Sequence, residues 1–199
     1  MANIYLNYFD KVFDKDQNSP KYTMGAKLIR YADDFVIMAK CINEKVTNWI
    51  EEKIEGRLEL SINKEKTKTV EVLPNRDELN FLGYSFRFVK DRRGRAWHYL
   101  NITPSKKAIS SLKEKIRNTT KRGVVRPFPE VIEEVNTITR GWYNYFKFGY
   151  PRGACREINY YLQIRFKAFF RNRSQRKSKP FREGETAYQG LKRLGLKYL

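Results

Sequence analysis

The first hydrophobic pattern along the chain has the period of an α-helix. Apolar side chains recur three or four positions apart within residues 2–14, at Ile4, Tyr5, Tyr8, Phe9, Val12 and Phe13. We therefore predict an amphipathic helix over residues 2–14. A second apolar stripe predicts a helix that Asn43 caps and Gly56 ends.

Other stretches of the first half favour strands. Two short apolar runs, residues 28–32 and 35–39, flank the polar pair Asp33–Asp34 and predict a hairpin that turns at this pair. Further strands are predicted at residues 58–62, 69–73, 81–89 and 95–102, the last two joined by a turn at residues 91–94.

Helical spacing returns after residue 102. Thr103 is predicted to cap a helix with Pro104 in its first turn, and further helices are predicted from about residue 129 and over residues 155–170. A basic, extended stretch then ends in a short helix at residues 187–193. We therefore predict an α+β chain with three parts, which are a mixed domain at 1–102, a helical domain at 103–172 and a basic C-terminal tail at 173–199.

Net charge separates the two halves more sharply than hydrophobicity does. The 199 residues are 41% hydrophobic, enough to build a core, and carry a net charge of +19. Residues 1–102 hold 18 basic and 15 acidic side chains, whereas residues 103–199 hold 23 basic and 7 acidic ones. Such an imbalance favours a polyanionic partner, and nucleic acid is the natural candidate. A membrane surface is the alternative, although no predicted helix sets a purely basic face against an apolar one.

The remaining composition excludes several kinds of site. Cys41 and Cys155 lie far apart and His98 is the one histidine, so neither a zinc cluster nor a Cys/His nucleophile pair is expected. We expect reduced cysteines and no catalytic role for His98. No apolar run approaches the roughly 20 residues of a membrane span, and the charged N-terminal stretch does not fit a signal peptide. We therefore expect a cytoplasmic protein without a membrane partner.

Asp33 and Asp34 are the strongest candidates for chemistry. Two adjacent carboxylates repel each other unless a cation lies between them, and Mg²⁺ prefers carboxylate oxygens together with phosphates and water. Metal ions held in this way stabilise the attacking and leaving oxygens of a phosphoryl transfer. The alternative is an ordinary solvated turn.

The surroundings of this pair resemble the palm domain of reverse transcriptases. Tyr31-Ala32-Asp33-Asp34 resembles their YxDD box, and residues 2–6, 58–68 and 80–84 resemble neighbouring sequence blocks in the same order. The resemblance implies RNA-directed DNA polymerisation, with Mg²⁺ held by Asp33 and Asp34. It also implies a catalytic role for Lys66 and a primer grip formed by Phe81, Leu82, Gly83 and Tyr84.

The second half is similar to the thumb, or maturase domain, of group II intron reverse transcriptases. Residues 141–146, Gly-Trp-Tyr-Asn-Tyr-Phe, are similar to its hallmark helix, and residues 173–176 and 191–196 to its C-terminal end. The resemblance implies binding of structured intron RNA in support of splicing and mobility. An RNA template and a DNA primer are the further partners that it implies.

One part of that family's active site has no match in this sequence. The family uses another aspartate, from a strand well before the YxDD hairpin, and Asp10, Asp14 and Asp16 do not fit that setting. We therefore expect either a polymerase that depends on a separate N-terminal half, or a non-catalytic RNA-binding maturase module. An unpaired edge of the palm sheet also predicts self-association.

Basic side chains with few acidic neighbours are the candidate RNA contacts. They are Lys106, Lys107, Lys113, Lys115, Arg117, Lys121, Arg122, Arg171, Arg173 and Arg176. For the seven residues from Lys106 to Arg122 the alternative is a solvated helix face. For Arg171, Arg173 and Arg176 it is a disordered arm. Trp142, Tyr143, Tyr145 and Phe146 are expected to pack in the core rather than to stack on bases.

Overall fold

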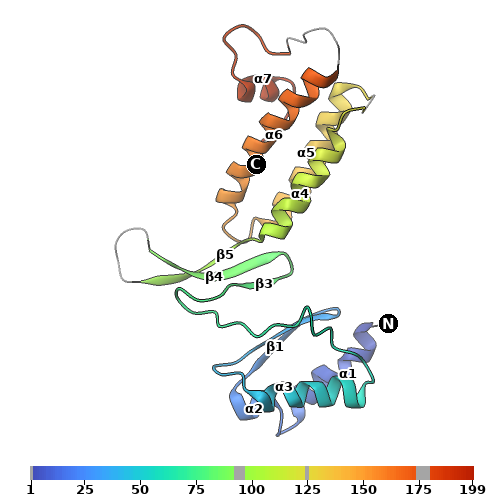
Figure 1. Cartoon of the computed structure of the whole chain (residues 1–199), viewed down its shortest axis with the longest axis vertical. Helices are drawn as coiled ribbons and strands as arrows, with labels where there is room; N and C mark the ends of the chain where they lie inside the picture. Colours follow the sequence, from blue (N-terminus) through green and yellow to red (C-terminus); the bar gives the residue numbers. More distant parts are fainter. Residues whose placement is uncertain (1, 92–96, 124–125, 174–179) are drawn as a thin grey trace. The chain divides into compact units, whose positions relative to one another are not determined.

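The chain folds into two compact units, Met1–Val70 and Glu71–Leu199, of mixed helix and sheet. The computed structural model describes residues 2–91, 97–123, 126–173 and 180–199 (Figure 1). Residues 1–70 hold 12 basic and 11 acidic side chains, whereas residues 71–199 hold 29 basic and 11 acidic ones. The division between the units therefore separates charge more completely than the boundary predicted at residue 102, and it groups the second predicted hairpin with the helices.

The first unit consists of short helices packed on a two-stranded hairpin. Its elements are α1 Ala2–Lys15, α2 Pro20–Met24, β1 Lys27–Tyr31, β2 Asp34–Met38, α3 Glu44–Glu51 and the π-helix η1 Glu52–Arg57. Phe9, Phe13 and Trp49 are at the centre of its core, with both phenylalanine ring centroids 6.0 Å from that of Trp49. Burial of these large rings supplies much of the unit's hydrophobic stabilisation.

Both helices predicted in this unit are present, and only the predicted end of the second one differs. The helix predicted over residues 2–14 is present as α1. Asn43 caps α3, because its side-chain oxygen accepts a hydrogen bond from the backbone N–H of Val46 (3.3 Å). Gly56 was predicted to end this helix, but it lies inside the π-helix that continues it.

The strands predicted at residues 58–62 and 69–73 are absent. Both stretches are irregular backbone. The N–H of Leu60 donates to the carbonyl oxygen of Ile54 (3.1 Å), so the chain turns back on the preceding helix instead of pairing with a strand. Alternating apolar residues alone therefore gave the wrong prediction here.

The second unit begins with a three-stranded antiparallel sheet in the order β3–β4–β5. Its strands are β3 Leu79–Phe81, β4 Tyr84–Lys90 and β5 His98–Pro104. The strand predicted at residues 81–89 is interrupted by the turn Leu82–Gly83, whose φ angles are 49° and 79°. Two positive φ angles suit a tight hairpin, so the chain reverses where alternation predicts a continuous strand. Residues 92–96, which include most of the other predicted turn, lie outside the described residues.

Four helices follow the sheet in the described residues. They are α4 Lys106–Thr119, α5 Phe128–Phe146, α6 Arg152–Arg173 and α7 Ala187–Arg193. The cap predicted at Thr103 is wrong, because β5 continues through Pro104 and the hydroxyl of Ser105 accepts a hydrogen bond from the N–H of Ala108 (3.2 Å). The other helices lie where the apolar spacing predicts them. None of the helices in the described part of the chain is long and apolar enough to cross a membrane.

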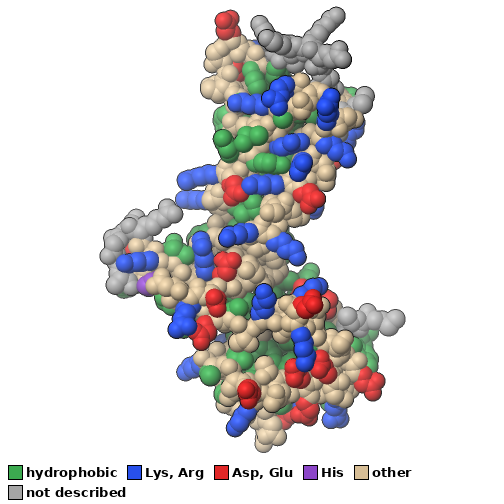
Figure 2. Space-filling view, in the orientation of Figure 1, with side chains coloured by type: hydrophobic (Ala, Val, Ile, Leu, Met, Phe, Trp, Pro, Cys, Tyr) green, Lys and Arg blue, Asp and Glu red, His purple; other side chains and the backbone are tan. Residues whose placement is uncertain are grey.

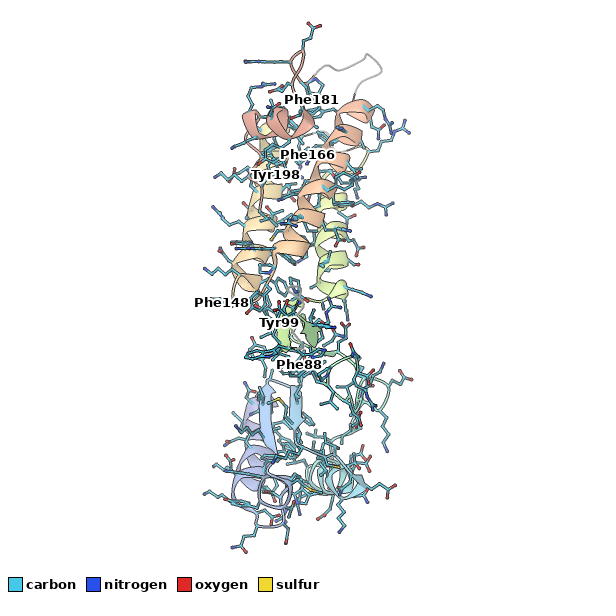
Figure 3. The ribbon with its side chains drawn as sticks, turned by 90° about the vertical axis from the view of Figure 1, so that its left-hand side faces the viewer. Phe88, Tyr99, Phe148, Phe166, Phe181 and Tyr198 are labelled. Atoms are coloured by element: carbon cyan, nitrogen blue, oxygen red, sulfur yellow. The ribbon has the colours of Figure 1, made fainter. Side chains whose placement is uncertain are left out.

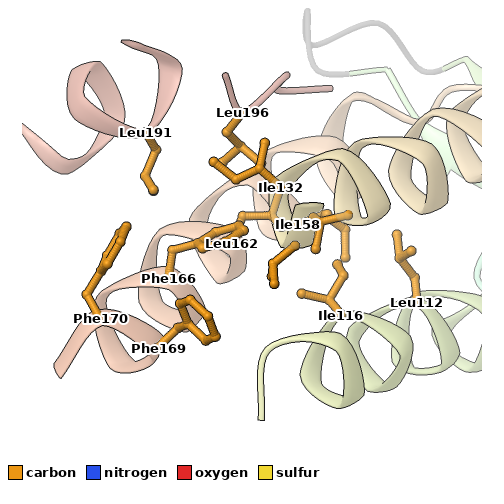
Figure 4. Close-up of a cluster of buried hydrophobic side chains, with 12 residues drawn as sticks. Leu112, Ile116, Ile132, Ile158, Leu162, Phe166, Phe169, Phe170, Leu191 and Leu196 are labelled. Atoms are coloured by element: carbon orange, nitrogen blue, oxygen red, sulfur yellow. The ribbon is translucent and has the colours of Figure 1, made fainter. Parts of the chain in front are cut away.

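One hydrophobic core joins these helices to the C-terminal segment. Ile116 of α4, Ile132 of α5 and Phe166 of α6 meet in it, together with Leu191 and Leu196 from the C-terminal segment (Figure 4). Leu191 has no exposed surface and Leu196 is 2% exposed. The last residues are therefore part of the folded unit.

Two asparagines fix the C-terminal backbone, which was predicted as an extended tail. The side chain of Asn136 donates to the carbonyl oxygen of Gly195 (2.9 Å) and accepts from the N–H of Lys197 (2.8 Å). Asn159 makes the same pair of bonds with the backbone of Leu199 (2.9 and 3.0 Å). The described part of the predicted tail is therefore bound to α5 and α6.

Candidate metal-binding turn and nucleic-acid interface

Asp33 and Asp34 lie at the tip of the β1–β2 hairpin. Tyr31 pairs with Asp34, so the turn consists of Ala32 and Asp33, one residue earlier than predicted. Ala32 has a φ angle of 55°, a left-handed conformation that costs an alanine about 1–2 kcal/mol. Both aspartates are exposed, so a metal ion and a phosphate have access to them.

Arg30 connects this turn to helix α1. Its guanidinium donates to the Asp10 carboxylate (Nε–Oδ1 2.9 Å), to the Asn3 side chain (2.9 Å) and to the carbonyl oxygen of Ala32 (2.7 Å). The hydrogen bonds that it donates to the Asp10 carboxylate raise the pKa of Arg30, so it stays charged. Only 13% of the Arg30 side chain is exposed. Sequence patterns did not indicate this role, because an arginine between apolar strand residues carries no periodic signal.

Replacing Arg30 with alanine is expected to destabilise the first unit by about 1–2 kcal/mol and to speed hydrogen exchange in the hairpin. The variant leaves the half-buried Asp10 carboxylate and the Ala32 carbonyl without their donor. Urea unfolding and hydrogen–deuterium exchange measure the two effects.

Lys21→Ala is the matched control for this variant. It breaks the exposed ion pair between Lys21 and Asp14 (2.9 Å), which is expected to cost less than about 1 kcal/mol. Equal losses in the two variants would contradict the assignment of Arg30 as the support of the turn.

The aspartate pair fits Mg²⁺ bound together with a nucleotide. In the described ranges, no three His, Cys, Asp or Glu side chains are grouped closely enough to hold a metal ion. Mg²⁺ commonly takes one or two carboxylates and completes its coordination with substrate phosphates and water. Asp33 and Asp34 supply that number of carboxylates at an open position, so they suit a shared site rather than a closed protein cage.

Lys66, the other predicted catalytic residue, lies on a second exposed turn of the first unit. The side-chain oxygen of Asn63 accepts a hydrogen bond from the N–H of Lys66 (3.1 Å), which shapes this turn. The side chain of Lys66 is therefore open to solvent and available to a charged ligand.

The predicted primer-grip turn is fixed to the C-terminal end of α5. The hydroxyl of Tyr145 donates to the carbonyl oxygen of Leu82 (2.9 Å), and the hydroxyl of Tyr84 donates to the carbonyl oxygen of Tyr145. The rings of Tyr84 and Phe146 pack edge to face, with centroids 4.9 Å apart. The primer-grip motif and the hallmark helix, which the sequence presents as separate motifs, therefore form one structural element.

The aromatic residues of the hallmark helix divide between core and surface. Phe146 is 5% exposed, as predicted, and Trp142 packs against the core of the helices. Tyr143 and Tyr145 are 38% and 51% exposed, so the predicted core position is wrong for both. Phe148, just beyond the helix, is also exposed (Figure 3).

Replacing Gly83 with alanine is expected to lower the free energy of unfolding of the second unit by about 2 kcal/mol. The φ angle of 79° strains any residue with a Cβ, and the new Cβ would lie 3.3 Å from Cζ of Phe146. Gly123→Ala is the control, since Gly123 has a φ of 90° but, among the described residues, no atom lies within 4 Å of its added Cβ. A larger loss at Gly123 in chemical unfolding would contradict tight packing of the turn on α5.

Exposed basic side chains follow helix α4 and the turn after it. The predicted contacts that are exposed here are Lys106, Lys107, Lys115, Arg117, Lys121 and Arg122. Lys113 differs, because it forms an ion pair with Glu157 of α6 and lies 5.5 Å from the Tyr161 ring. Lys113 therefore joins two helices, and this position is a weaker candidate for RNA contact than predicted.

Helix α6 carries a second row of exposed cations, most of which were not among the predicted contacts. Its exposed members are Arg152, Arg156, Lys167 and Arg171, with the exposed Tyr160 between them. Their spacing places them on one side of the helix, and none of these cations has an ion pair within the described ranges. Of the predicted contacts, only Arg171 belongs to this row. The side chain of Arg173 and the whole of Arg176 lie outside the described residues.

The cations of the second unit gather on its helices. Figure 2 shows Lys and Arg side chains over the helices of this unit, with few Asp and Glu side chains among them. We call the set on the two helices the α4/α6 basic surface. It comprises Lys106, Lys107, Lys115, Arg117, Arg152, Arg156, Lys167 and Arg171.

Comparison with known families gives a match to this helical part. Residues 109–187 match the family model described as group II intron, maturase-specific domain. The match begins in α4 and ends at the first residue of α7, so it includes most of the α4/α6 basic surface and supports the predicted relation to group II intron maturases. A comparison with curated proteins finds no match. The resemblance of residues 1–102 to a reverse-transcriptase palm stays a prediction.

Proposed function

We propose that this chain binds structured RNA of a group II intron and supports its splicing, because residues 109–187 are similar to a maturase-specific domain. The observation that carries this proposal is the α4/α6 basic surface, which lies mostly within the matched segment. Its cations are exposed on helices that share one hydrophobic core. Cations held on rigid helices suit a folded polyanion better than a flexible arm does.

The energetics of this surface favour recognition of shape. Each phosphate that a lysine or arginine neutralises releases counterions, so the affinity depends on salt and little on sequence. Folded RNA presents phosphates and 2′-hydroxyl groups across a shallow minor groove. The row from Arg152 to Arg171 spans about 28 Å at 1.5 Å per helical residue, long enough to contact several phosphates.

The direct test compares two RNAs of equal length, a transcribed group II intron and polyuridylate. The full chain is expected to bind the intron at least about tenfold more tightly at physiological salt, because the folded RNA presents its phosphates in a fixed array. It is also expected to accelerate splicing of that intron at low Mg²⁺. Equal affinities together with unchanged splicing would contradict the maturase role.

A second candidate function, RNA-directed DNA polymerisation, is favoured by the exposed aspartate pair on the turn that Arg30 supports. In this reaction a primer 3′-hydroxyl attacks the α-phosphate of a nucleotide. Asp33 and Asp34 would hold Mg²⁺, which when bound neutralises charge on the reacting phosphate. Lys66 would stabilise the departing pyrophosphate. The primer-grip turn, held by α5, would position the primer end.

Primer extension on an RNA template tests this second function. Asp34→Asn is expected to abolish extension by the full chain and to leave RNA affinity within about twofold, because the aspartate is not part of the basic surface. Extension that survives in Asp33→Asn and Asp34→Asn alike would contradict a role for the pair. RNA binding by the unmodified chain without any extension would identify a non-catalytic maturase module.

A further inference from the structure

A hollow on the second unit lies around its C-terminal motif at residues 191–196. Its volume is about 460 Å³, and it is lined by Tyr188, Lys192, Gly195, Leu196, Lys197 and Tyr198. These residues follow the segment that matches the maturase-specific domain. Ligand sites commonly have volumes of about 300–1,000 Å³, so this hollow is large enough for one nucleotide.

Two tyrosine rings form one wall of the hollow. The rings of Tyr188 and Tyr198 are stacked, with centroids 4.3 Å apart and planes 19° from parallel. Tyr188 is 44% exposed, whereas Tyr198 (Figure 3) is partly buried. The inner ring therefore supports the outer one, which presents an ordered aromatic surface to solvent.

The buried Tyr198 hydroxyl has no hydrogen-bond partner among the described residues. Burial and the neighbouring Tyr188 raise the pKa of Tyr198 to about 12, so the hydroxyl keeps its proton. A buried donor without a partner is uncommon in folded proteins, and a bound water or ligand is one frequent explanation.

Two lysines make the hollow positively charged. Lys192 and Lys197 are exposed, and neither has an ion pair in the part of the chain that the structure describes. Glu185, a carboxylate of the same segment, is already bound by the guanidinium of Arg193 (2.9 Å) and the N–H of Arg182 (2.8 Å). These bonds lower the pKa of Glu185 to about 2, so it stays ionised and bound to its own partners.

The walls of the hollow are held in place before any ligand binds. Leu196, which lines the hollow, and Leu191, next to the lining residue Lys192, are buried in the core. Asn136 fixes the backbone on both sides of Leu196, and Thr186 and Gln189 form a reciprocal cap at the start of α7. A preformed site loses little conformational entropy on binding.

We propose that this hollow binds one unpaired nucleotide of RNA, with the base against Tyr188 and the phosphates beside Lys192 and Lys197. An aromatic ring next to cations is the arrangement that binds single-stranded nucleic acid, since every base offers a face for stacking. A base inside a duplex is not available for this contact. The inference rests on the proposed RNA-binding function and adds to it a site for a single-stranded position.

The test uses the full chain and two fluorescent probes, an oligouridylate of about ten nucleotides and a blunt RNA duplex of about ten base pairs. Tyr188→Ala is expected to weaken oligouridylate binding about tenfold, the size expected for one lost base–aromatic stack, and to change duplex binding by less than about twofold. Tyr188→Phe keeps the ring and is expected to bind both probes like the unmodified chain. Lys192→Gln is expected to lower the slope of log affinity against log salt for oligouridylate by about 1.

Tyr5→Ala is the matched control, because Tyr5 is 55% exposed on a helix of the other unit. It is expected to change neither affinity. Equal losses on both probes in Tyr188→Ala, or no loss on either, overturn the nucleotide site while RNA binding itself stands. Competition by polyglutamate as strong as that by oligouridylate also overturns it, in favour of an acidic peptide. Failure of the unmodified chain to bind either RNA overturns this inference and the proposed function together.

Discussion

Replacing Leu191 with alanine is expected to lower the free energy of unfolding of the second unit by about 2–5 kcal/mol. Leu191 is fully buried in the core that α4, α5 and α6 form. The substitution removes its methyl groups from contact with that core and leaves a cavity that close-packed neighbours fill only in part. Domains of this kind have a total stability of about 5–15 kcal/mol, so the loss is large.

Leu73→Ala is the matched control for this prediction. Leu73 belongs to the same unit, but it is 52% exposed and lies in irregular backbone. Its replacement is expected to change the free energy of unfolding by less than about 0.5 kcal/mol. Urea unfolding followed by circular dichroism measures both variants. Similar losses in the two would contradict the packing of the C-terminal segment into the core.

Reversing two charges on the α4/α6 basic surface is expected to weaken binding to structured RNA about 100-fold at low salt. The pair Lys115→Glu and Arg117→Glu tests α4, and the pair Arg156→Glu and Lys167→Glu tests α6. All four side chains are exposed, and none has an ion pair within the described part of the chain, so the fold is expected to tolerate the changes. The slope of log affinity against log salt is expected to fall by about 2, or about 1 for each lost phosphate contact.

The control for this experiment reverses two lysines of the first unit, Lys11→Glu and Lys45→Glu. Both are exposed, and the double variant changes the net charge of the chain by the same amount. It is expected to retain affinity within about threefold, since local phosphate contacts matter more than total charge. A loss equal to that of the α4 and α6 variants would show that net charge alone drives binding. Fluorescence anisotropy across a KCl series measures all three variants.

Lys113 is a separate case on the same helix. Sequence composition selects it together with its neighbours, but the structure binds it to Glu157. Replacing it is expected to loosen the α4–α6 contact and to affect RNA affinity less directly. The difference between Lys113 and Lys115 depends on a partner 44 residues away in the sequence, which no local pattern reports.

Local sequence patterns predicted the long helices well. The spacing of apolar residues located α1, α4, α5 and α6, because each buries one face against a core and that face repeats with the helical period. The same reasoning failed for residues 58–62 and 69–73. There the apolar residues follow helix η1 into irregular backbone that pairs with no strand, and alternation cannot distinguish this arrangement from a sheet.

For this protein, the sequence alone determined the aspartate pair, the helix faces, the charge imbalance and the resemblance to maturases. These features depend on residue types and on short-range spacing. Only the tertiary structure decided three contacts. Arg30 links the aspartate turn to Asp10 of α1, Leu191 packs into the core formed by α4, α5 and α6, and Tyr188 borders a basic hollow. The physical reason is that each of these contacts joins different helices and strands, so it exists only after the chain has folded.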